Sequence, residues 1–435
     1  MVIINSTDPE EMPYSAICKE EVLQAGFKAR HMSPPLQWYV WVIIGVSILA
    51  IVIIAANVLY WRFLRPKDPI DMIAQNFKLN EEEKKLFSNA RDKLFIDETM
   101  VEVDYNVILG RGASSTVYKA IIKGIAPSLR PKKELESAVS EDYIVAAKVS
   151  NQFGREQIEE LIGEIEAART LENHPNICSM LGWSTHLGAP CLLFESMELD
   201  LLSYIKSLRV ESIDTTSEND SLSQASVPVS EHYSVPDFDE NQQKIYLQIL
   251  WQATKGLEYI ASKNIVHRDV AARNFLLSRS GVTFTAKVAD FGLCSNVDEN
   301  TNVYRSTLNK RLPIKWLAIE CLVDRTFSQA SDVWAFGITM IEMYSCASEL
   351  YPGIGLNEVT DFLKEGKRME KPEKMPQEMY DIAFSCWNED PSSRPTFLDL
   401  RDQFETILRS KDYGYLGINE NDQEEIDAKS IDVTF

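Results

Sequence analysis

The chain has 435 residues, of which 45% are hydrophobic and 25% are charged, so it can form a domain with its own core and further segments. Its formal net charge of -21 argues against a nucleic-acid partner, because an acidic protein repels phosphate backbones. The seven cysteines show no paired metal-ligand spacing, and most fall in apolar segments that suit buried free thiols in a reducing compartment.

The first strong pattern is an apolar segment over residues 38–61, built almost entirely from Val, Ile, Leu and Ala without a charge. Aromatic residues flank it on both sides, as they do at membrane interfaces. Each central Ile, Leu or Val favours insertion by about 0.3–0.6 kcal/mol, which outweighs the cost of Asn57 near one end. The segment lacks the polar stripe of a core helix and the cleavage pattern of a signal peptide. We therefore predict a transmembrane helix over 38–61.

Basic residues give the orientation of this helix. Arg62, Arg65 and Lys67 follow it directly, whereas Lys28 and Arg30 lie farther away on the other side. Because positive charge favours the cytosolic side, we expect a single-pass protein of the cell membrane with its N-terminus outside.

Residues 1–37 would then be a short extracellular segment, which is too short for an independent folded core. Asn5, followed by Ser6 and Thr7, fits a glycosylation acceptor. Cys18 is the one cysteine on this side, and it can form an intermolecular disulfide or stay a free or capped thiol. We keep a homodimer linked through Cys18 as a hypothesis.

Residues 62–102 are polar and charged and are expected to form a juxtamembrane linker. Opposite charges recur at helical spacing over residues 81–94, which predicts some helical content. The first strand of the following domain is expected near residues 103–108.

Two patterns on the cytosolic side suit a nucleotide. Residues 110–117 form a glycine-rich loop between two predicted strands, where missing side chains let backbone N–H groups approach phosphate oxygens. Ser115 occupies the third glycine position, and since serine adopts a positive φ at a higher cost, we expect this loop to cover the phosphates less well. Residues 145–148 form an apolar strand that ends in Lys148, and Glu164 lies in a helical pattern farther on.

The region from about 211 to 240 is rich in Ser, Thr, Asp and Glu. Such a composition cannot bury much surface, so we predict a flexible insert there.

The stretch from His267 to Asn274, followed by Asp290, Phe291 and Gly292, contains the parts of a phosphoryl-transfer site. Asp269 would accept the proton of the attacking hydroxyl, and Asn274 and Asp290 would hold the metal ion. With this stretch, residues 103–410 resemble a protein kinase domain. The resemblance implies an α+β fold with a small β-rich lobe and a large helical lobe.

The same resemblance implies the cofactors ATP and Mg²⁺ or Mn²⁺. Lys148 would pair with the nucleotide phosphates and with Glu164, and Phe194 would guard the back of the pocket and fill the space left by Ala168. Ala146 and Leu276 would enclose the adenine ring, and the hinge from Glu195 to Met197 would bind it. The implied ATP-binding residues are Leu109, Gly110, Gly112, Val117, Ala146, Lys148, Glu195, Met197 and Leu276.

The catalytic stretch also resembles tyrosine kinases rather than serine/threonine kinases. Ala271 stands where serine/threonine kinases generally have lysine, and the arginine falls at Arg273, which counts among the implied catalytic residues. Residues 312–316, Leu-Pro-Ile-Lys-Trp, resemble the segment that carries the substrate backbone in tyrosine kinases. We therefore expect a receptor-type protein tyrosine kinase with a very short extracellular segment, whose substrates are proteins carrying tyrosine.

One tyrosine, Tyr304, lies in the polar segment expected to be the activation loop. Phosphate on Tyr304 would be read by Arg268, which lies beside the catalytic aspartate. At the end of this loop Ile319 replaces the proline of the family, so the turn is expected to be looser, while Glu320 and Arg394 would pin the loop to the lobe.

Other tyrosines are candidates for docking of phosphotyrosine-binding adaptors. Tyr233 lies in the insert, and Tyr413 and Tyr415 lie at the start of an acidic C-terminal tail over 411–435. Unmodified tyrosines in flexible segments, or tyrosines packed against the lobe, remain the alternative.

Two classes of function compete: an active membrane-anchored tyrosine kinase and a catalytically weak or silent kinase-like scaffold. A scaffold commonly lacks the lysine, the base or a metal ligand. Lys148, Glu164, Asp269, Asn274 and Asp290 are all present here, which favours the enzyme.

Overall fold

The computed structural model describes residues 34–60, 81, 84–85, 94–112, 115–124, 142–150, 155–186, 189–211, 233–281, 283–298, 301–305 and 312–410. The chain divides into two units, residues 1–68 and 69–435. The predictions made for Asn5, Cys18, Tyr413, Tyr415 and the tail lie outside the described residues.

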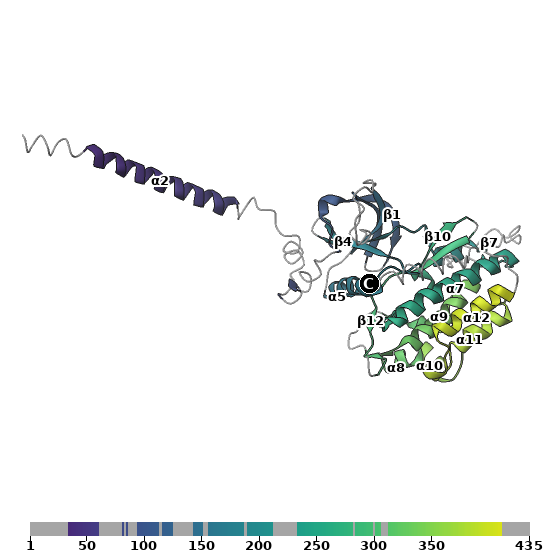
Figure 1. Cartoon of the computed structure of the whole chain (residues 1–435). Helices are drawn as coiled ribbons and strands as arrows, with labels where there is room; N and C mark the ends of the chain where they lie inside the picture. The colour runs from purple at the N-terminus through teal and green to yellow at the C-terminus, as the bar shows by residue number, and fades with distance from the viewer. Residues whose placement is uncertain are drawn as a thin grey trace, which may run out of the picture. The chain divides into compact units, whose positions relative to one another are not determined.

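The first unit contains helix α2 (Pro34–Leu59), which Figure 1 shows in purple. Residues Tyr39–Leu59 have a mean hydropathy of 2.9 and are long and apolar enough to cross a membrane. The carboxamide of Asn57 donates to the Ile53 carbonyl at 3.4 Å, so its polar atoms are partly satisfied within the helix. Among the described residues, one helix is therefore apolar and long enough for a span, and it overlaps the predicted segment 38–61.

The small lobe of the second unit is an antiparallel sheet with helix α5 (Arg155–Leu171) beside it. In the order in which they pair, the strands are β1 (Val101–Arg111), β2 (Ser115–Ile122), β3 (Tyr143–Ser150), β5 (Ala189–Glu195) and β4 (Met180–His186).

A short segment before β1 extends this sheet at the edge of β4. Ile96 N donates to Trp183 O and Trp183 N donates to Leu94 O, both at 2.8 Å, in a parallel bridge. Phe95 packs edge-on against the Trp183 ring, and Ile96 is buried. Gly182 makes the contact possible, because a Cβ there would meet Ile96 Cδ1 at 2.6 Å. The end of the predicted linker, 62–102, is therefore packed onto the small lobe.

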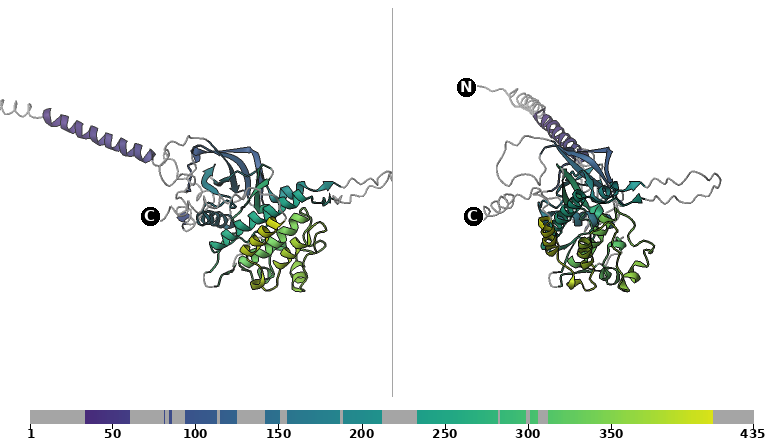
Figure 2. Two further views of the ribbon diagram at one scale, coloured as in Figure 1. Left: turned by 45° about the vertical axis from the view of Figure 1, so that its right-hand side comes forward. Right: turned by 90° about the vertical axis from the view of Figure 1, so that its right-hand side faces the viewer.

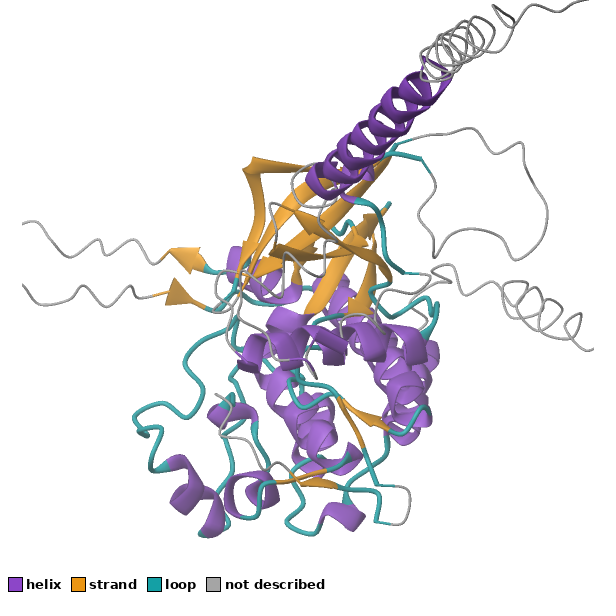
Figure 3. Cartoon of the chain, turned by 90° about the vertical axis from the view of Figure 1, so that its left-hand side faces the viewer, coloured by secondary structure: helices purple, strands orange, loops and turns teal. Residues whose placement is uncertain are grey.

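The large lobe consists mainly of helices, and Figure 3 shows them in purple below the orange strands of the small lobe. Helix α7 packs along α12, as both views of Figure 2 show. The helices are α6 (Leu201–Ser207), α7 (Glu240–Ser262), α8 (Ile319–Val323), α9 (Gln329–Tyr344), α10 (Val359–Lys364), α11 (Gln377–Ser385) and α12 (Phe397–Ser410), with 3-10 helices η4 (Ala272–Asn274), η5 (Ile314–Trp316) and η6 (Pro391–Ser393).

Between these helices, short strands form small sheets of two or three strands. β10 (Phe275–Ser280) pairs with β11 (Thr283–Val288) and β6 (Leu199–Asp200). The remaining pairs are β9 (Ile265–Val266) with β12 (Ser295–Asn296), β13 (Tyr304–Arg305) with β14 (Thr326–Phe327), and β7 (Val210–Glu211) with β8 (Tyr233–Ser234).

The hairpin of β7 and β8 corrects the insert predicted at about 211–240. Tyr233 pairs with Glu211 in this hairpin, and Phe238 packs against the rings of Tyr246 and Tyr344. Asp239 then caps α7 by accepting a hydrogen bond from Gln242 N. The C-terminal part of the predicted insert is thus packed on the lobe, because an aromatic ring and a helix cap anchor it, while residues 212–232 lie outside the described residues.

Helix α9 is the centre of the large lobe, and its residues from Ser331 to Tyr344 are buried. Apolar side chains of α7, α11 and α12 surround it. Two carboxylates of α9, Asp332 and Glu342, are buried among them and need partners. The expected α+β, two-lobed fold is confirmed.

Candidate active site

Lys148 connects the two lobes through its ammonium group. Strand β3 places Lys148 Nζ 2.9 Å from both carboxylate oxygens of Glu164 on α5 and 3.0 Å from Asp290 Oδ1. Glu164 is buried, whereas the side chain of Asp290 is half-exposed. The sequence predicted the first of these two ion pairs, and the second was not expected.

The two neighbouring carboxylates determine the protonation state of the Lys148 ammonium. Burial alone would lower the pKa of Lys148, but the carboxylates of Asp290 and Glu164 raise it well above its ordinary value. The Lys148 ammonium in turn lowers the pKa of Asp290. Lys148 therefore stays cationic and Asp290 stays anionic, as binding of phosphates and of a metal ion requires.

Asp269 is held by two side chains of η4. Arg273 Nη2 forms an ion pair with Asp269 Oδ1, and Asn274 Nδ2 donates to Asp269 Oδ2 at 2.8 Å and to the Asp269 carbonyl at 2.7 Å. The Asp269 carboxylate is thus fixed in one orientation, as a positioned general base must be.

Helix α9 holds the start of the catalytic stretch. Asp332 accepts hydrogen bonds from His267 N at 2.7 Å and from Arg268 N at 2.9 Å. Burial raises the pKa of Asp332 to about 7, although these two N–H groups act against the shift. Arg268 has a φ of 69° and Asp290 a φ of 62°, a left-handed backbone that costs free energy and persists only where contacts enforce it.

His267 is fully buried and neutral. Its Nδ1 accepts from Asp269 N at 3.3 Å, so the proton is on Nε2, which donates to the Ala289 carbonyl at 3.1 Å. Burial lowers the pKa of His267, which agrees with this tautomer. His267 therefore joins the stretch that carries Asp269 to the one that carries Asp290.

The two predicted metal ligands fit a hard divalent cation. Asn274 uses its amide nitrogen on Asp269, and no described residue donates to its oxygen Oδ1. Asp290 adds an exposed carboxylate, and Ala289 N donates to the Asn274 carbonyl at 2.8 Å, which places the two residues together. Mg²⁺ prefers such a site, with one or two protein oxygens completed by water and phosphate. Within the described residues no group of three His, Cys, Asp or Glu side chains could hold a metal.

The residues expected to bind the adenine ring come from both lobes. Ala146 and Leu276 pack against one buried cluster that contains Phe194. Ala168 lies against the same cluster, as expected if Phe194 fills the space beside it. Met197 follows β5, and no backbone hydrogen bond within the described residues uses its N–H or carbonyl group. These two groups are suited to bind the base edge.

The glycine-rich loop joins β1 to β2. Gly110 pairs with Val117, Val117 pairs with Lys148, and Leu109 precedes Gly110 on β1. Gly112 N donates to the Ser115 carbonyl at 2.8 Å. Ser115 lies in strand β2 and has no positive φ. The prediction that Ser115 needs a positive φ is therefore wrong, because the backbone at this position is extended.

Glu195 does not direct its side chain to the base. Its carboxylate accepts from Lys287 Nζ at 2.7 and 2.8 Å and from Ser179 N at 2.7 Å. The side chain thus fixes the end of β5, and only its backbone is left for the predicted role.

Arg268 is buried beneath Tyr304. Its guanidinium carbon lies 4.7 Å from the centre of the Tyr304 ring and 4.5 Å from that of Phe327. Nη1 donates to Leu293 O and Ser295 Oγ, whereas Nε and Nη2 are buried without a partner among the described residues. Two donor nitrogens without acceptors in a buried cation are suited to receive an anion.

The end of the predicted activation loop is fixed by a bidentate ion pair. Arg394 Nη1 and Nη2 lie 2.7 and 2.9 Å from the two oxygens of Glu320, and the Arg394 side chain is fully buried. Ile319 is the first residue of α8, and Ala318 before it has an extended backbone.

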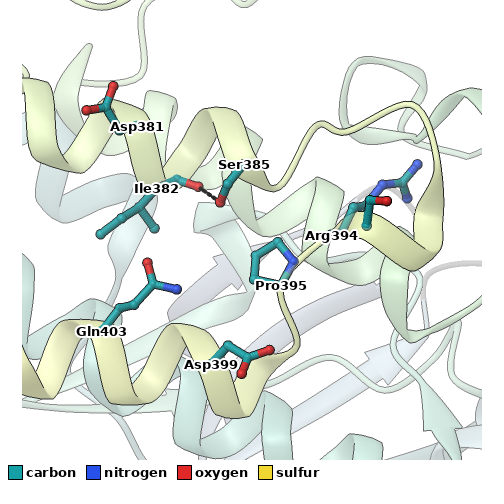
Figure 4. A pocket seen from close by; sticks show the side chains of 8 residues that line it. Asp381, Ile382, Ser385, Arg394, Pro395, Asp399 and Gln403 are labelled. Carbon is teal, nitrogen blue, oxygen red and sulfur yellow. Dashed lines mark hydrogen bonds between the residues drawn. The ribbon is translucent and has the colours of Figure 1, made fainter.

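A surface hollow of about 520 Å³ lies beyond this pair, between α11 and α12. Figure 4 shows Ser385 hydrogen-bonded to Ile382 and Asp399 at the start of α12. Asp399 accepts hydrogen bonds from the backbone N–H and the hydroxyl of Thr396, so its carboxylate is satisfied within the chain. The hollow has no contact with the residues around Asp269 and does not contribute to the candidate site.

Asp332, Glu342 and Lys287 support the site and were not among the predicted site residues. Their signal in the sequence was a charge inside an apolar segment, since a charge that is buried, as in Asp332 and Glu342, or partly buried, as in Lys287, needs a partner. Which groups these three side chains bind could be known only from the structure.

Comparisons with known proteins agree with this geometry. Residues 103–404 match the family described as protein tyrosine and serine/threonine kinase. Over 339 residues the chain is 33% identical to a predicted tyrosine-protein kinase of Caenorhabditis elegans, and the match covers 76% of this chain and 37% of the relative. Over 308 residues it is 30% identical to a fibroblast growth factor receptor of Hydra vulgaris, and the match covers 71% of this chain and 34% of the relative. The matched part spans just over a third of the length of these relatives.

Proposed function

The chain belongs to the family of protein tyrosine and serine/threonine kinases, and we propose that it is a membrane-anchored, receptor-type tyrosine kinase that uses ATP. The observation that carries this proposal is the fixed Asp269 carboxylate beside the pairing of Lys148 with Glu164 and Asp290.

In this proposal Asp269 accepts the proton of the substrate hydroxyl as the oxygen attacks the γ-phosphate. Arg273 and Asn274 keep its carboxylate aimed, so little orientation is left to arrange in the transition state. A divalent cation, Mg²⁺ or Mn²⁺, bound by Asn274 and Asp290 would neutralise charge on the phosphates.

Lys148 would change partners when the nucleotide binds. Its ammonium now binds both Glu164 and Asp290. On nucleotide binding Lys148 would keep Glu164 and direct its remaining N–H donors to phosphate oxygens, which frees Asp290 for the cation.

Tyrosine is the preferred acceptor on two grounds. Ala271 stands where serine/threonine kinases generally have a lysine, and Arg273, the arginine of the tyrosine-kinase pattern, lies on the Trp316 ring, 4.7 Å from its centre. The relatives named as a tyrosine kinase and a growth factor receptor support the same acceptor and a receptor role.

Activation would proceed through Tyr304. Phosphorylation adds about two negative charges to this residue, which then offers acceptors to the unpartnered Nε and Nη2 of Arg268. The strand pair β13–β14 would hold the loop while this contact forms.

Helix α2 would anchor the kinase domain beneath the cell membrane, with the N-terminal segment outside. Glycosylation of Asn5, a dimer through Cys18, and adaptor docking at Tyr233, Tyr413 or Tyr415 remain parts of this proposal.

The experiment is phosphorylation by the full-length chain in detergent or nanodiscs, with ATP and Mg²⁺, on matched peptides that carry tyrosine or serine. The wild type is expected to label the tyrosine peptide and itself, and Asp269→Asn to be slower by roughly 10²–10⁴-fold. Equal labelling by the two proteins, or none by either, would favour the silent scaffold. Labelling of serine alone would overturn the tyrosine assignment.

A further inference from the structure

Glu342 ties together two segments that both bear on Asp269. One oxygen of its carboxylate, Oε2, accepts from Ala272 N at 3.0 Å and from Trp316 Nε1 at 2.9 Å. Glu342 lies on the central helix α9 and is 5% exposed. A single buried oxygen therefore links η4 of the catalytic stretch to η5 of the segment expected to carry the substrate.

The bond to Ala272 orients η4. The first N–H groups of a helix have no acceptor within it, and Ala271 at the N-cap has no side chain to supply one. Glu342 supplies a charged acceptor instead. The next two residues of η4 are Arg273 and Asn274, and both bind Asp269.

The bond to Trp316 orients its indole ring. The Arg273 guanidinium lies 4.7 Å from the centre of that ring, and Arg273 also pairs with Asp269 Oδ1. A rotation of the indole would remove the surface on which Arg273 rests. Glu342 thus reaches Asp269 by two routes, through η4 and through the indole.

We propose that Glu342 is a positioning residue for phosphoryl transfer, which keeps the base and the substrate-carrying segment in one fixed relation. The inference rests on the proposed kinase function. Both N–H groups donate to the same carboxylate oxygen, so an acceptor at this point is what the geometry requires. Burial raises the pKa of Glu342, and the bonds from Ala272 and Trp316 oppose that shift and favour the ionised form.

The expected signature is a change in kcat without a change in KM for ATP. The hydrogen bonds that join Lys148 to Glu164 and Asp290 do not involve Glu342, so nucleotide binding should not depend on it. A displacement of about 1 Å at a reacting group commonly slows a reaction by about 10²-fold. We expect Glu342→Leu to lower kcat about 10–100-fold with KM for ATP within about twofold.

The conservative variant Glu342→Gln separates positioning from charge. Its amide oxygen can accept from both N–H groups, because both donate to the same oxygen in the wild type. We expect it to restore kcat to within about threefold of wild type. Trp316→Phe removes the indole N–H and keeps an aromatic face under Arg273, and it should lower kcat less than Glu342→Leu.

The experiment measures kcat, both KM values and the melting temperature of the full-length protein and these variants on the tyrosine peptide. Ile338→Val, a buried change on the same helix, is the control for loss of packing and should keep the wild-type kcat well below its melting temperature. The double variant Glu342→Leu/Trp316→Phe should lose less activity, in the logarithm of kcat, than the sum of the losses of the two single variants, since the two residues act through one contact.

The outcomes are distinct from those that test the proposed function. If the wild type phosphorylates no peptide, the proposed function fails. If the wild type is active and Glu342→Leu keeps its kcat, or Glu342→Gln is as slow as Glu342→Leu, the positioning role is overturned. If Glu342→Leu does not fold, an unchanged kcat in Trp316→Phe overturns the role, and a lowered kcat supports it.

Discussion

The guanidinium of Arg268 is stacked on the ring of Tyr304, with 4.7 Å between its carbon and the ring centre. The residue proposed to read a phosphate therefore already contacts the tyrosine that would carry it. The ring of unphosphorylated Tyr304 covers one face of the Arg268 guanidinium, while the Arg268 nitrogens Nε and Nη2 have no acceptor among the described residues.

Tyr304→Phe should leave the folded protein intact and remove its activation. The ring still covers Arg268, so stability should change by less than about 1 kcal/mol. Preincubation with ATP should raise the activity of the wild type but not that of the variant, as measured by initial rates on a tyrosine peptide. Tyr143→Phe, at an exposed site on β3, serves as the control and should activate normally. Equal activation of all three proteins would refute the switch.

Glu164→Gln should make the enzyme dependent on a high metal concentration. Lys148 loses one anionic partner and keeps Asp290, so it competes with the cation for that carboxylate. We expect activity about 10–100-fold below wild type at low Mg²⁺ and partial recovery at high Mg²⁺. Glu166→Gln changes an exposed residue of the same helix and should match the wild type. The absence of any recovery with Mg²⁺ would contradict competition at Asp290.

Asp332→Asn should change how stability depends on pH. The folded pKa of Asp332 is about 7 and its ordinary value is 3.8, so the folded state binds the proton more tightly than the unfolded state. In the wild type this contribution is present at low pH and is lost as pH rises to about 7. Relative to the variant, the wild type should lose about 3 kcal/mol between pH 5 and pH 8, as measured by urea unfolding. A constant difference between the two proteins would show that Asp332 ionises normally.

Gly182→Ala should release the segment before β1 from the sheet. The new Cβ would lie 2.6 Å from Leu94 O and from Ile96 Cδ1, and such overpacking costs about 1–3 kcal/mol. The melting temperature should fall accordingly. A Cβ added at Gly163 on α5 would meet nothing within 4 Å, so Gly163→Ala should instead stabilise the protein by up to about 1 kcal/mol. Equal melting temperatures for Gly182→Ala and wild type would mean that this segment does not contribute to stability.

Glu320→Gln should destabilise the large lobe strongly. Arg394 is fully buried and would be left without its anionic partner, which typically costs about 3–5 kcal/mol. Glu349→Gln removes an exposed carboxylate that pairs with Lys315, and it should cost less than about 1 kcal/mol because water can replace that partner. The free energies of unfolding of the two variants, measured with urea, test whether burial of Arg394 causes the larger destabilisation. Similar decreases in the two variants would exclude burial as the cause.

The sequence predicted the parts of the fold and site that short motifs determine. The resemblance of short motifs to protein kinases implied the residues around Asp269 and the pairing of Lys148 with Glu164, and an uninterrupted apolar composition predicted the helix. The buried acceptor at Glu342 does not, because its donors come from segments that only the packed lobe brings together.

Two errors of prediction also have physical reasons. The sequence predicts a costly positive φ at Ser115 in the glycine-rich loop, yet Ser115 pairs with Ser150 as part of strand β2. The end of the insert was read as flexible from its composition, although Phe238 supplies enough apolar contact to hold it. One well-placed ring outweighed the average polarity of the segment.

The hairpin of β7 and β8 also provides a place in the large lobe where extra residues can be inserted. Val210 pairs with Ser234 and Glu211 with Tyr233, so the two points of attachment of residues 212–232 are adjacent in the lobe. Doubling the length of a flexible loop whose ends are fixed raises its closure entropy by only about 0.6 kcal/mol. A reporter, an affinity tag or a longer natural segment can therefore be inserted there at little thermodynamic expense.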